Sequence, residues 1–293
     1  MKRLGALALV LALAGVANAD ETEVTFAYVP APGVEKVVIV QPLGRLTVRG
    51  WDRHEVRIAA TKRAPDRAGL DRLRVRVDLK GGRLEIATGV RVGEALMPMP
   101  TDAGYVIDLA VDTPVAVQIE ASTFDGDLDA IGLRAGVVLS TTGGAIHATD
   151  IDGSVHATAT RGRQRLAAIR GDVDADVLSG ALELDSIEGA VLHATVVSGP
   201  VAARRIHSRV VQLVAARGDI QLAGGMPLGA HWVLRAPAGS ARIAIEGVPM
   251  SLALRAGHQL DALMSHGERT WTLDRPGSAR LLEVDVGQDL ELR

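Results

Sequence analysis

The chain has 293 residues, 47% of them hydrophobic and 23% charged, which is the composition of a folded protein and not of a disordered one. Aromatic residues make up only 2%, so we expect a core of stacked Val, Ile, Leu and Ala. The absence of cysteine excludes disulfides, thiolate metal sites, cysteine nucleophiles and a lipid anchor on cysteine. The formal net charge of −3 gives no reason to expect a general affinity for nucleic acid.

The N-terminus has the three parts of a signal peptide. Met1-Lys2-Arg3 is basic, residues 4–16 are apolar, and Ala17-Asn18-Ala19 has the small-x-small pattern that signal peptidase reads. The apolar run is shorter than the roughly 20 residues that span a bilayer. We therefore expect removal of residues 1–19, a mature N-terminus at Asp20, no membrane span after cleavage, and a periplasmic, secreted or cell-surface location.

Residues 20–120 are predicted to form an N-terminal β-region with antiparallel pairing. Apolar and polar residues alternate over 44–50, 55–58, 106–111 and 115–119, and this period of two is typical of strands. Lys80-Gly81-Gly82 separates the alternating segments 73–79 and 84–86, which predicts a hairpin. Residues 89–104 contain Gly, Met and Pro without a period, and we expect them to be a loop.

Residues 121–225 repeat with a period near 20 residues. Glycines recur 18 or 19 residues apart at Gly126, Gly144, Gly162, Gly180, Gly199 and Gly218. Seven residues after the first five stand Leu133, Ile151, Ile169, Ile187 and Ile206, and eleven residues after them stand Val137, Val155, Val173, Val191 and Val210. Such a period is typical of a solenoid, in which stacked repeats share one core.

The fold class predicted from these patterns is all-β: a single-stranded parallel β-solenoid with an N-terminal antiparallel β-region and a C-terminal cap. Each repeat holds two short strands, and repeats stack about 4.8 Å apart. Ile151, Ile169 and Ile187 should share one interior ladder, and Arg165 should be the outward neighbour of Glu183. Residues 226–293 should supply closing strands and a cap, with the larger side chains Trp232 and Trp271 covering the end of the core.

Two groups of residues resemble a bacterial family of unknown function that is labelled "putative adhesin". Gly44 to Asp52, followed by Glu55-Val56, looks like the opening of that family. Thr141 to Gly144, Leu178 to Gly180 and Val197 to Gly199 look like the repeats of its body. The resemblance covers roughly residues 35–290 and implies a signal peptide and a β-solenoid. It brings no catalytic motif, and the chain departs from the pattern where Arg precedes Gly162 and Gly218.

Acidic residues gather near the predicted turns, at Asp125, Asp127, Asp129, Asp150, Asp152, Asp172, Asp174 and Asp176. Solenoids that cleave polysaccharides use wall carboxylates as acids, bases or calcium ligands. Alternatively, Asp beside Gly is ordinary turn chemistry, because its short side chain caps backbone N–H groups.

Four histidines and two tripeptides are the remaining candidates. His147, His156, His193 and His207 take different places in their repeats, and only His156 and His193 are expected on one wall. Mostly unligated surface histidines are the alternative to a metal site. Arg170-Gly171-Asp172 and Arg217-Gly218-Asp219 match an integrin-binding tripeptide, although turn glycines and abundant Arg produce the same letters.

The function expected from the sequence is non-catalytic: an exported protein that binds or scaffolds an unknown envelope or surface component, protein or polysaccharide, or acts in adhesion. No catalytic, cofactor or metal residue is assigned, and alanine at Asp172 or Asp174 should hardly affect function. The alternative is an enzyme that acts on an acidic envelope polysaccharide. That activity needs a groove in which several carboxylates and an Arg or Lys converge.

Overall fold

The computed structural model describes residues 21–100, 104–245, 251–256, 260–262, 265–266, 270–273 and 280–292. The predicted signal peptide and Asp20 lie outside the described residues. The chain divides into two compact units, Met1–Gly144 and Ala145–Arg293, each described here by itself. Strands form 71% of the structure, with one short helix among the described residues, so the predicted all-β solenoid class is confirmed.

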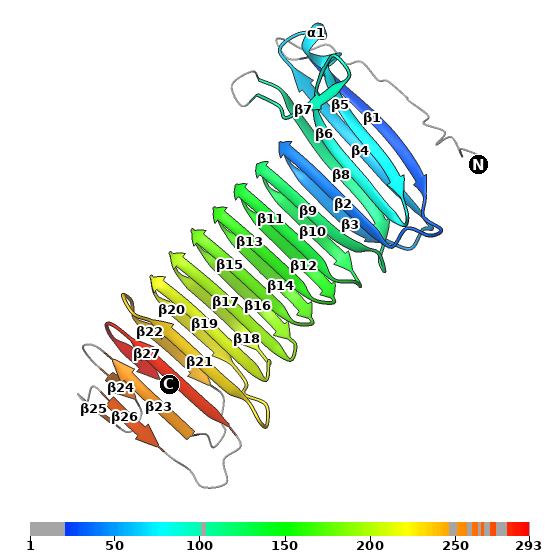
Figure 1. Ribbon diagram of the computed structural model, residues 1–293. Helices are drawn as coiled ribbons and strands as arrows, with labels where there is room; N and C mark the ends of the chain where they lie inside the picture. The colour runs from blue at the N-terminus through cyan, green and yellow to red at the C-terminus, as the bar shows by residue number, and fades with distance from the viewer. Residues whose placement is uncertain are drawn as a thin grey trace. The chain divides into compact units, whose positions relative to one another are not determined.

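The first unit consists of strands in two sheets (Figure 1). Its elements are β1 (Glu21–Pro30), β2 (Lys36–Leu43), β3 (Leu46–Trp51), β4 (Glu55–Ala64), α1 (Arg67–Leu70), β5 (Leu73–Lys80), β6 (Arg83–Val92), β7 (Ala95–Met97), β8 (Val106–Pro114), β9 (Gln118–Asp125), β10 (Leu128–Leu133) and β11 (Val137–Gly143). One sheet has the order β1-β4-β8-β3-β10, and the other has the order β11-β9-β2-β6-β5, with β7 paired to β6. Antiparallel pairs β1–β4, β4–β8 and β5–β6 lie in the N-terminal region, as predicted.

The pair β2–β3 is a solenoid repeat that the sequence period did not reveal. β2 pairs in parallel with both β6 and β9, and β3 pairs in parallel with both β8 and β10. The turn between them begins at Gly44, whose N–H donates to the carbonyl of Asp125. Arg45 contacts Asp127, 82 positions later in the chain. The glycine column therefore starts at Gly44, and a long insertion separates this repeat from the next.

One expectation for the first unit was wrong. Residues 89–104 are not one loop, because β6 continues to Val92 and pairs antiparallel with β7, Val90 opposite Met97. The first unit also contains a short helix, α1, which follows β4. It is one turn long and begins with Asp66 as its N-cap, whose side chain accepts from the N–H of Gly69. A single turn is too short to show a helical stripe of apolar residues.

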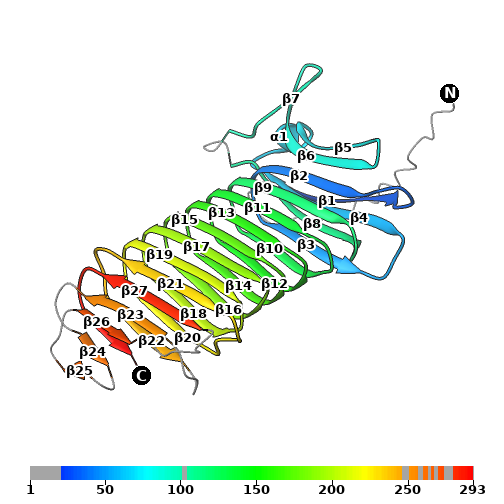
Figure 2. The ribbon, with the colours of Figure 1, turned by 60° about the horizontal axis from the view of Figure 1, so that its bottom comes forward.

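The second unit is a stack of two-stranded repeats, called rungs below (Figure 2). Its strands are β12 (Ile146–Asp152), β13 (Val155–Arg161), β14 (Gln164–Arg170), β15 (Val173–Ser179), β16 (Leu182–Glu188), β17 (Val191–Ser198), β18 (Val201–Ile206), β19 (Val210–Arg217), β20 (Ile220–Gly224), β21 (His231–Ala236), β22 (Ala241–Ile245), β23 (Ser251–Ala256), β24 (Leu260–Ala262), β25 (Ser265–His266), β26 (Thr270–Leu273), β27 (Leu281–Val286) and β28 (Leu290–Leu292). The even sheet has the order β12-β14-β16-β18-β20-β22-β28-β24-β25. The odd sheet has the order β13-β15-β17-β19-β21-β27-β23-β26.

The last rungs of the second unit depart from chain order. β27 pairs in parallel with β21 on one side and with β23 on the other. β28 likewise lies between β22 and β24. The C-terminal strands therefore occupy an interior place in both sheets, and earlier segments lie outside them.

The interior ladder that the spacing predicts is present. Ile151 is the parallel neighbour of Ile169, which neighbours Ile187, and all three side chains are fully buried. The valine column holds only as far as Val173. Val191 and Val210 are 39% and 42% exposed, and Leu192 and Val211 are the buried residues in register instead. The prediction failed there because β17 and β19, in the 19-residue rungs, begin one residue before the register position of Val173.

The glycine ladder is required by sterics. Gly180 has a φ of 148°, in the region that favours glycine, and a Cβ there would lie closer than 3.0 Å to the carbonyl oxygen of Gly162. Gly199 and Gly218 stand in the same relation to the rung before them. The glycine N–H groups bond along the stack, as from Gly180 to the carbonyl of Ser198. These turns have no room for a side chain.

A second column has a left-handed backbone without glycine. In the even sheet Asp150, Ala168, Ser186 and Arg205 have φ values of 57°, 53°, 57° and 52°. Each lies directly before a buried isoleucine of the ladder, and each is skipped in the pairing between neighbouring strands. The column therefore marks a bend that repeats in every one of these strands. The four residues are of different types, so the sequence does not indicate this bend.

The aliphatic interior of the second unit also contains polar and aromatic side chains. Gln164 is fully buried between Ile146 and Leu182, and its amide donates to the carbonyls of Ala157 and Asp176 at 3.2 and 2.8 Å. Trp232 is also fully buried, and its Nε1 donates to the carbonyl of Ser208 at 2.9 Å. Trp232 therefore packs inside the core at β21, and the expectation that it covers the end of the core was wrong. The side chain of Trp271 lies outside the described residues.

Candidate functional site

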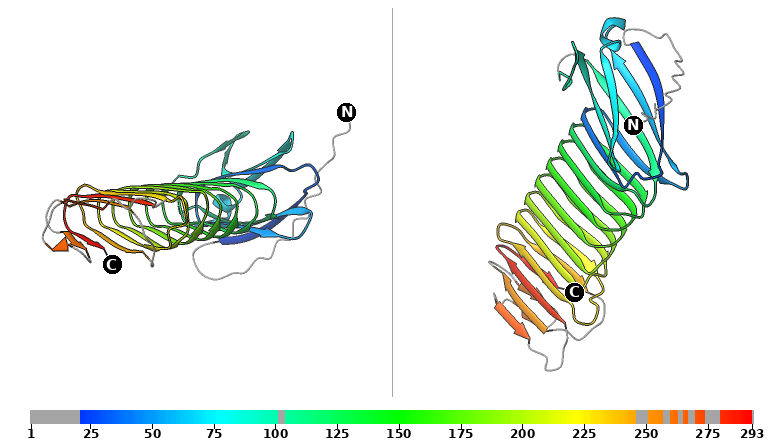
Figure 3. Two further views of the ribbon diagram at one scale, coloured as in Figure 1. Left: turned by 90° about the horizontal axis from the view of Figure 1, so that it is seen from below. Right: turned by 45° about the vertical axis from the view of Figure 1, so that its right-hand side comes forward.

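The outer wall of the second unit presents one side chain per rung in each column. Seen along the stack, the rungs form two flat layers around a narrow interior (Figure 3). Because neighbouring parallel strands lie about 4.8 Å apart, side chains in one column keep a fixed spacing. The candidate chemistry of the wall is therefore defined by its columns.

His156, Asp174 and His193 form one such column on the odd sheet. Asp174 is the register neighbour of both histidines. Its Oδ2 lies 3.0 Å from Nδ1 of His156, and its Oδ1 lies 3.6 Å from Nδ1 of His193. The three side chains are about half exposed. The expectation that both histidines share a wall is confirmed, and the sequence did not show that one carboxylate lies between them.

The two Arg-Gly-Asp sequences are used inside the turns. Asp172 Oδ1 accepts from the backbone N–H of Val191 at 2.9 Å, and Asp219 Oδ1 accepts from that of Ser240 at 2.9 Å. Arg170 lies 3.6 Å from Asp152 on the rung before it. Both aspartates thus cap backbone groups of the following rung, the role that turn chemistry predicts for Asp beside Gly.

The other acidic candidates do not converge on one point within either unit. Asp150 and Asp152 belong to β12 of the even sheet, whereas Asp174 and Asp176 belong to β15 of the odd sheet. In the first unit, Asp127 lies 3.2 Å from Arg45, and Asp129 lies 3.5 Å from the hydroxyl of Thr47. Each unit therefore distributes its carboxylates over strands and turns.

On the even sheet, the charged column runs through His147, Arg165 and Glu183 in register, as the spacing predicts. The ion pair of Glu183 is with Arg163, at 3.6 Å. Arg163 directly precedes the strand that carries Arg165. His207 follows the end of β18, and its N–H donates to the carbonyl of Ile187. His147 belongs to β12 and His207 follows β18, so these two histidines lie on different rungs.

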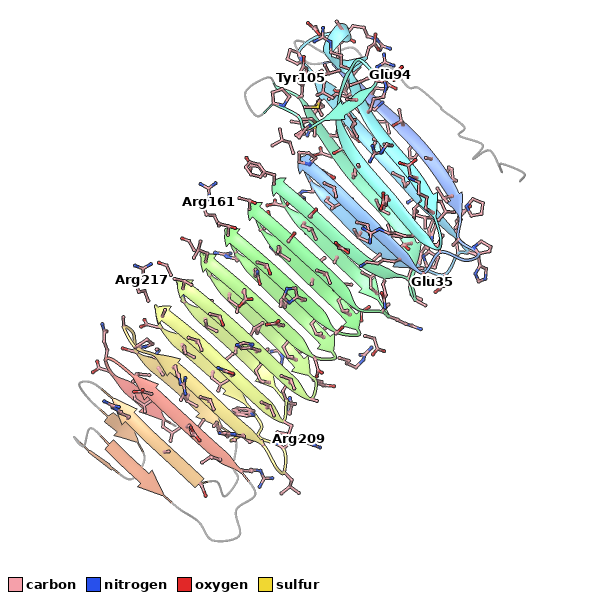
Figure 4. The ribbon with its side chains drawn as sticks, in the orientation of Figure 1. Glu35, Glu94, Tyr105, Arg161, Arg209 and Arg217 are labelled. Carbon is pink, nitrogen blue, oxygen red and sulfur yellow. The ribbon has the colours of Figure 1, made fainter. Side chains whose placement is uncertain are left out.

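Four residues form a further column at the turn edge of the odd sheet, called the turn-edge row below. Arg161, Ser179, Ser198 and Arg217 are consecutive register neighbours on four rungs. Both arginines are exposed and project from the same edge of the stack, opposite the edge that carries Arg209 (Figure 4). Among the described residues neither arginine has an ion-pair partner. These are the two positions at which the chain departs from the small residue of the resembling family.

A depression of about 390 Å³ lies over β20, β22 and β28 and is lined by Asp219, Gln221, Ser240, Arg242, Asp289 and Glu291, with the backbone between them. Arg242 Nε donates to Glu291 at 2.5 Å, and this hydrogen bond raises the pKa of Arg242. The hydroxyl of Ser240 accepts from the N–H of Asp289 at 3.3 Å. Carboxylates and a guanidinium thus do converge at one place, which no repeat column of the sequence had indicated.

The first unit has two further clusters of note. The guanidinium groups of Arg53 and Arg57 lie 5.0 and 5.4 Å from the ring centre of Trp51, and Arg57 also binds the buried Asp112. An apolar depression of about 300 Å³ is lined by Val90, Val92, Ala95, Met97, Pro98 and Pro100 around the β6–β7 hairpin. Neither cluster combines a nucleophile with a base.

The described part of the chain lacks two features that would point to other functions. No group of three or more His, Asp or Glu side chains there has a geometry that could hold a metal ion. No helix there is long and apolar enough to cross a membrane.

Solved structures that are similar to this chain include three bacterial proteins. A putative lipid binding protein from Parabacteroides distasonis is 12% identical, and the match covers 92% of this chain and 96% of that one with a TM-score of 0.46. A putative adhesin from Bacteroides fragilis is 9% identical, and the match covers 92% of this chain and 97% of that one with a TM-score of 0.42. A putative cell adhesion protein from Clostridium sporogenes is 10% identical, and the match covers 93% of this chain and 100% of that one with a TM-score of 0.31. No protein-family model matches the sequence, and neither does any curated protein. Two of the three names agree with the family that the sequence resembles, but TM-scores below 0.5 assign no function to this chain.

Proposed function

We propose that this chain is an exported, non-catalytic protein that binds an envelope or surface component through the wall of its second unit. The observation that carries the proposal is the turn-edge row. It presents two guanidinium groups and, between them, two hydroxyls from Ser179 and Ser198, on four successive rungs. Guanidinium groups bind carboxylate and phosphate oxygens with two hydrogen bonds each. The row therefore fits a partner whose anionic groups repeat along a chain.

The spacing of the row supports binding at more than one point. Arg161 and Arg217 are separated by three rungs, or roughly 14 Å at the usual strand spacing. The turns that carry them contain Gly162 and Gly218, members of the glycine ladder, where close backbone contacts fix the conformation. A rigid scaffold loses little conformational entropy when it binds, so two modest contacts can act together.

The test is a binding measurement on isolated envelope fragments and on polygalacturonate, with neutral dextran as the uncharged comparison. We expect the double variant Arg161→Ala/Arg217→Ala to lose at least about tenfold in affinity, and the affinity of the unmodified protein to fall as salt is added. Arg209→Ala, on the opposite edge, is the matched control and should bind normally. Equal loss in the control, or no loss in the double variant, contradicts the role of the row.

The export part of the proposal has its own test. The basic, apolar and small-x-small segments of residues 1–19 support cleavage after Ala19. N-terminal sequencing of the protein recovered from cells should give Asp20 as the first residue, and fractionation should place it in the periplasm or outside the cell. Recovery of an intact Met1 contradicts the proposal of a cleaved signal peptide.

A second candidate function, cleavage of an acidic polysaccharide, is favoured by the depression beside Arg242. Three carboxylates and one guanidinium line it, which is the convergence that such an enzyme needs. In its present arrangement Arg242 is held by Glu291. Measurement of new reducing ends from polygalacturonate decides between the functions. Release that Arg242→Ala abolishes, and that Arg209→Ala leaves intact, would replace the binding function by the enzymatic one.

A further inference from the structure

The first strand of the structure is an open sheet edge. β1 is the terminal strand of its sheet, and all ten of its residues are paired with β4, from Glu21 opposite Ala64 to Pro30 opposite Glu55. Among the described residues, β1 has no strand on its other side. A strand of this length and regularity offers a row of backbone donors and acceptors to another strand.

The edge of the other sheet of this unit is protected, whereas β1 is not. β5 carries Arg74, Arg76 and Lys80 along its length, and such charges hinder edge-to-edge association. β1 has neither Lys nor Arg, and its proline is the last residue, Pro30. It carries instead Phe26 and Tyr28, in a chain that has only two Phe and two Tyr.

The carboxylates of β1 do not supply the missing protection. Glu23 lies 3.8 Å from Nζ of Lys62, and Glu21 lies 3.8 Å from Arg67. Both charges are thus neutralised from within their own unit. The edge that remains is formed by Thr, Val and aromatic side chains, the residue types that favour strand pairing.

We propose that β1 pairs with β1 of a second copy of this chain, antiparallel about a two-fold axis at Thr25. The sequence of β1 is self-complementary in this register. Val24 faces the partner's Phe26, and Thr22 faces the partner's Tyr28, which are favourable cross-strand pairs of β-branched and aromatic side chains. A parallel pairing in register would instead place each glutamate beside its own counterpart.

The charge pattern favours the same alignment. Both glutamates of β1 lie in its first half, and both aromatic residues lie in its second half. The two-fold axis sets the acidic half of each copy against the apolar half of the other, so that Glu23 faces the partner's Ala27. The contact is isologous and closes with two copies, so it uses the open edge without generating a fibre.

The test uses the secreted protein and measures its molar mass by light scattering after gel filtration. We expect twice the mass of one chain for the unmodified protein, and the mass of one chain for Phe26→Lys, because a lysine at the middle of the edge is a barrier to pairing. Asp78→Lys, on the protected edge strand β5, is the matched control and should remain dimeric. Circular dichroism should be the same for all three.

Cross-linking tests the register separately. The chain has no cysteine, so Thr25→Cys introduces a single thiol. At the two-fold axis two such residues are directly opposite each other, within the 4.4–6.8 Å between Cα atoms that a disulfide requires. Thr25→Cys should form covalent dimers on oxidation, and Glu21→Cys should not. An unmodified protein that has the mass of one chain at about 100 µM, a dimer that survives Phe26→Lys, or efficient cross-linking of Glu21→Cys alone would overturn the proposal.

Discussion

A Cβ atom on Gly180 would lie closer than 3.0 Å to the carbonyl oxygen of Gly162 on the preceding rung. We expect Gly180→Ala to lower the free energy of unfolding by about 3 kcal/mol or more, because both the backbone angle and the close approach resist a side chain. Gly229→Ala is the control, since Gly229 also has a positive φ, of 75°, but nothing within 4 Å of the added carbon. Urea unfolding of the two variants should separate them clearly, and equal losses would mean that crowding at Gly180 is unimportant.

The isoleucine ladder predicts a large loss from a single charge. Ile169 is fully buried between Ile151 and Ile187, so Ile169→Asp places an unpaired carboxylate in an aliphatic interior. We expect a loss of several kcal/mol, on the order of 4 kcal/mol, or failure to fold. Ile169→Val, the matched variant, should cost only about 1 kcal/mol. Near-native stability of the Asp variant in thermal unfolding would contradict the register.

The left-handed column predicts a stabilising substitution. Ala168 has a φ of 53°, which is unfavourable for a residue with a Cβ, and its side chain is exposed. Ala168→Gly should therefore gain about 0.5 kcal/mol, after allowance for the greater freedom of glycine in the unfolded chain. Ala167→Gly, one residue earlier and without a positive φ, should lose about as much. Chemical denaturation should show opposite signs for the two variants; a loss in both would remove the case for strain at Ala168.

Lys62 predicts a change of stability with pH. Burial lowers its pKa below the ordinary 10.5, against the attraction of Glu23, with Arg74 and Asp71 also acting on it. Between the lowered pKa and 10.5, Lys62 binds more protons in the unfolded chain than in the folded chain, so the contribution of Lys62 to stability rises as pH rises through that range. As pH approaches 10.5, the unmodified protein should therefore gain unfolding free energy relative to Lys62→Met. A difference that stays constant with pH would show that burial does not disfavour the charged lysine.

The regular part of the fold could be predicted because each of its repeating positions accepts only one kind of residue. Only glycine fits the turns of the ladder, and only aliphatic side chains suit positions such as Ile169. The left-handed column was not predictable in this way, because residues as different as Asp150 and Ala168 adopt the same positive φ, so no residue type is shared along the column. The rung of Gly44 was also missed, since an insertion removes it from the period.

The candidate site was predictable only where it depends on position within a repeat. The shared wall of His156 and His193 follows from rung spacing, and so does the capping role of Asp172. The depression beside Arg242 depends on Glu291, whose strand pairs with β22 out of chain order. Because this pairing does not follow the period of the repeats, the sequence does not predict that those residues lie close together.

The place of β27 between β21 and β23 has a consequence for the order in which the chain acquires structure. A ribosome delivers β23 before β27, so β21 cannot pair with its partner in the folded protein until residues 281–286 have been synthesised. The middle rungs can be added one after another from neighbouring sequence, whereas this closure joins segments far apart and is correspondingly slow. A chain that stops before residue 281 would leave β21 and β22 as bare edges, open to pairing with other nascent chains.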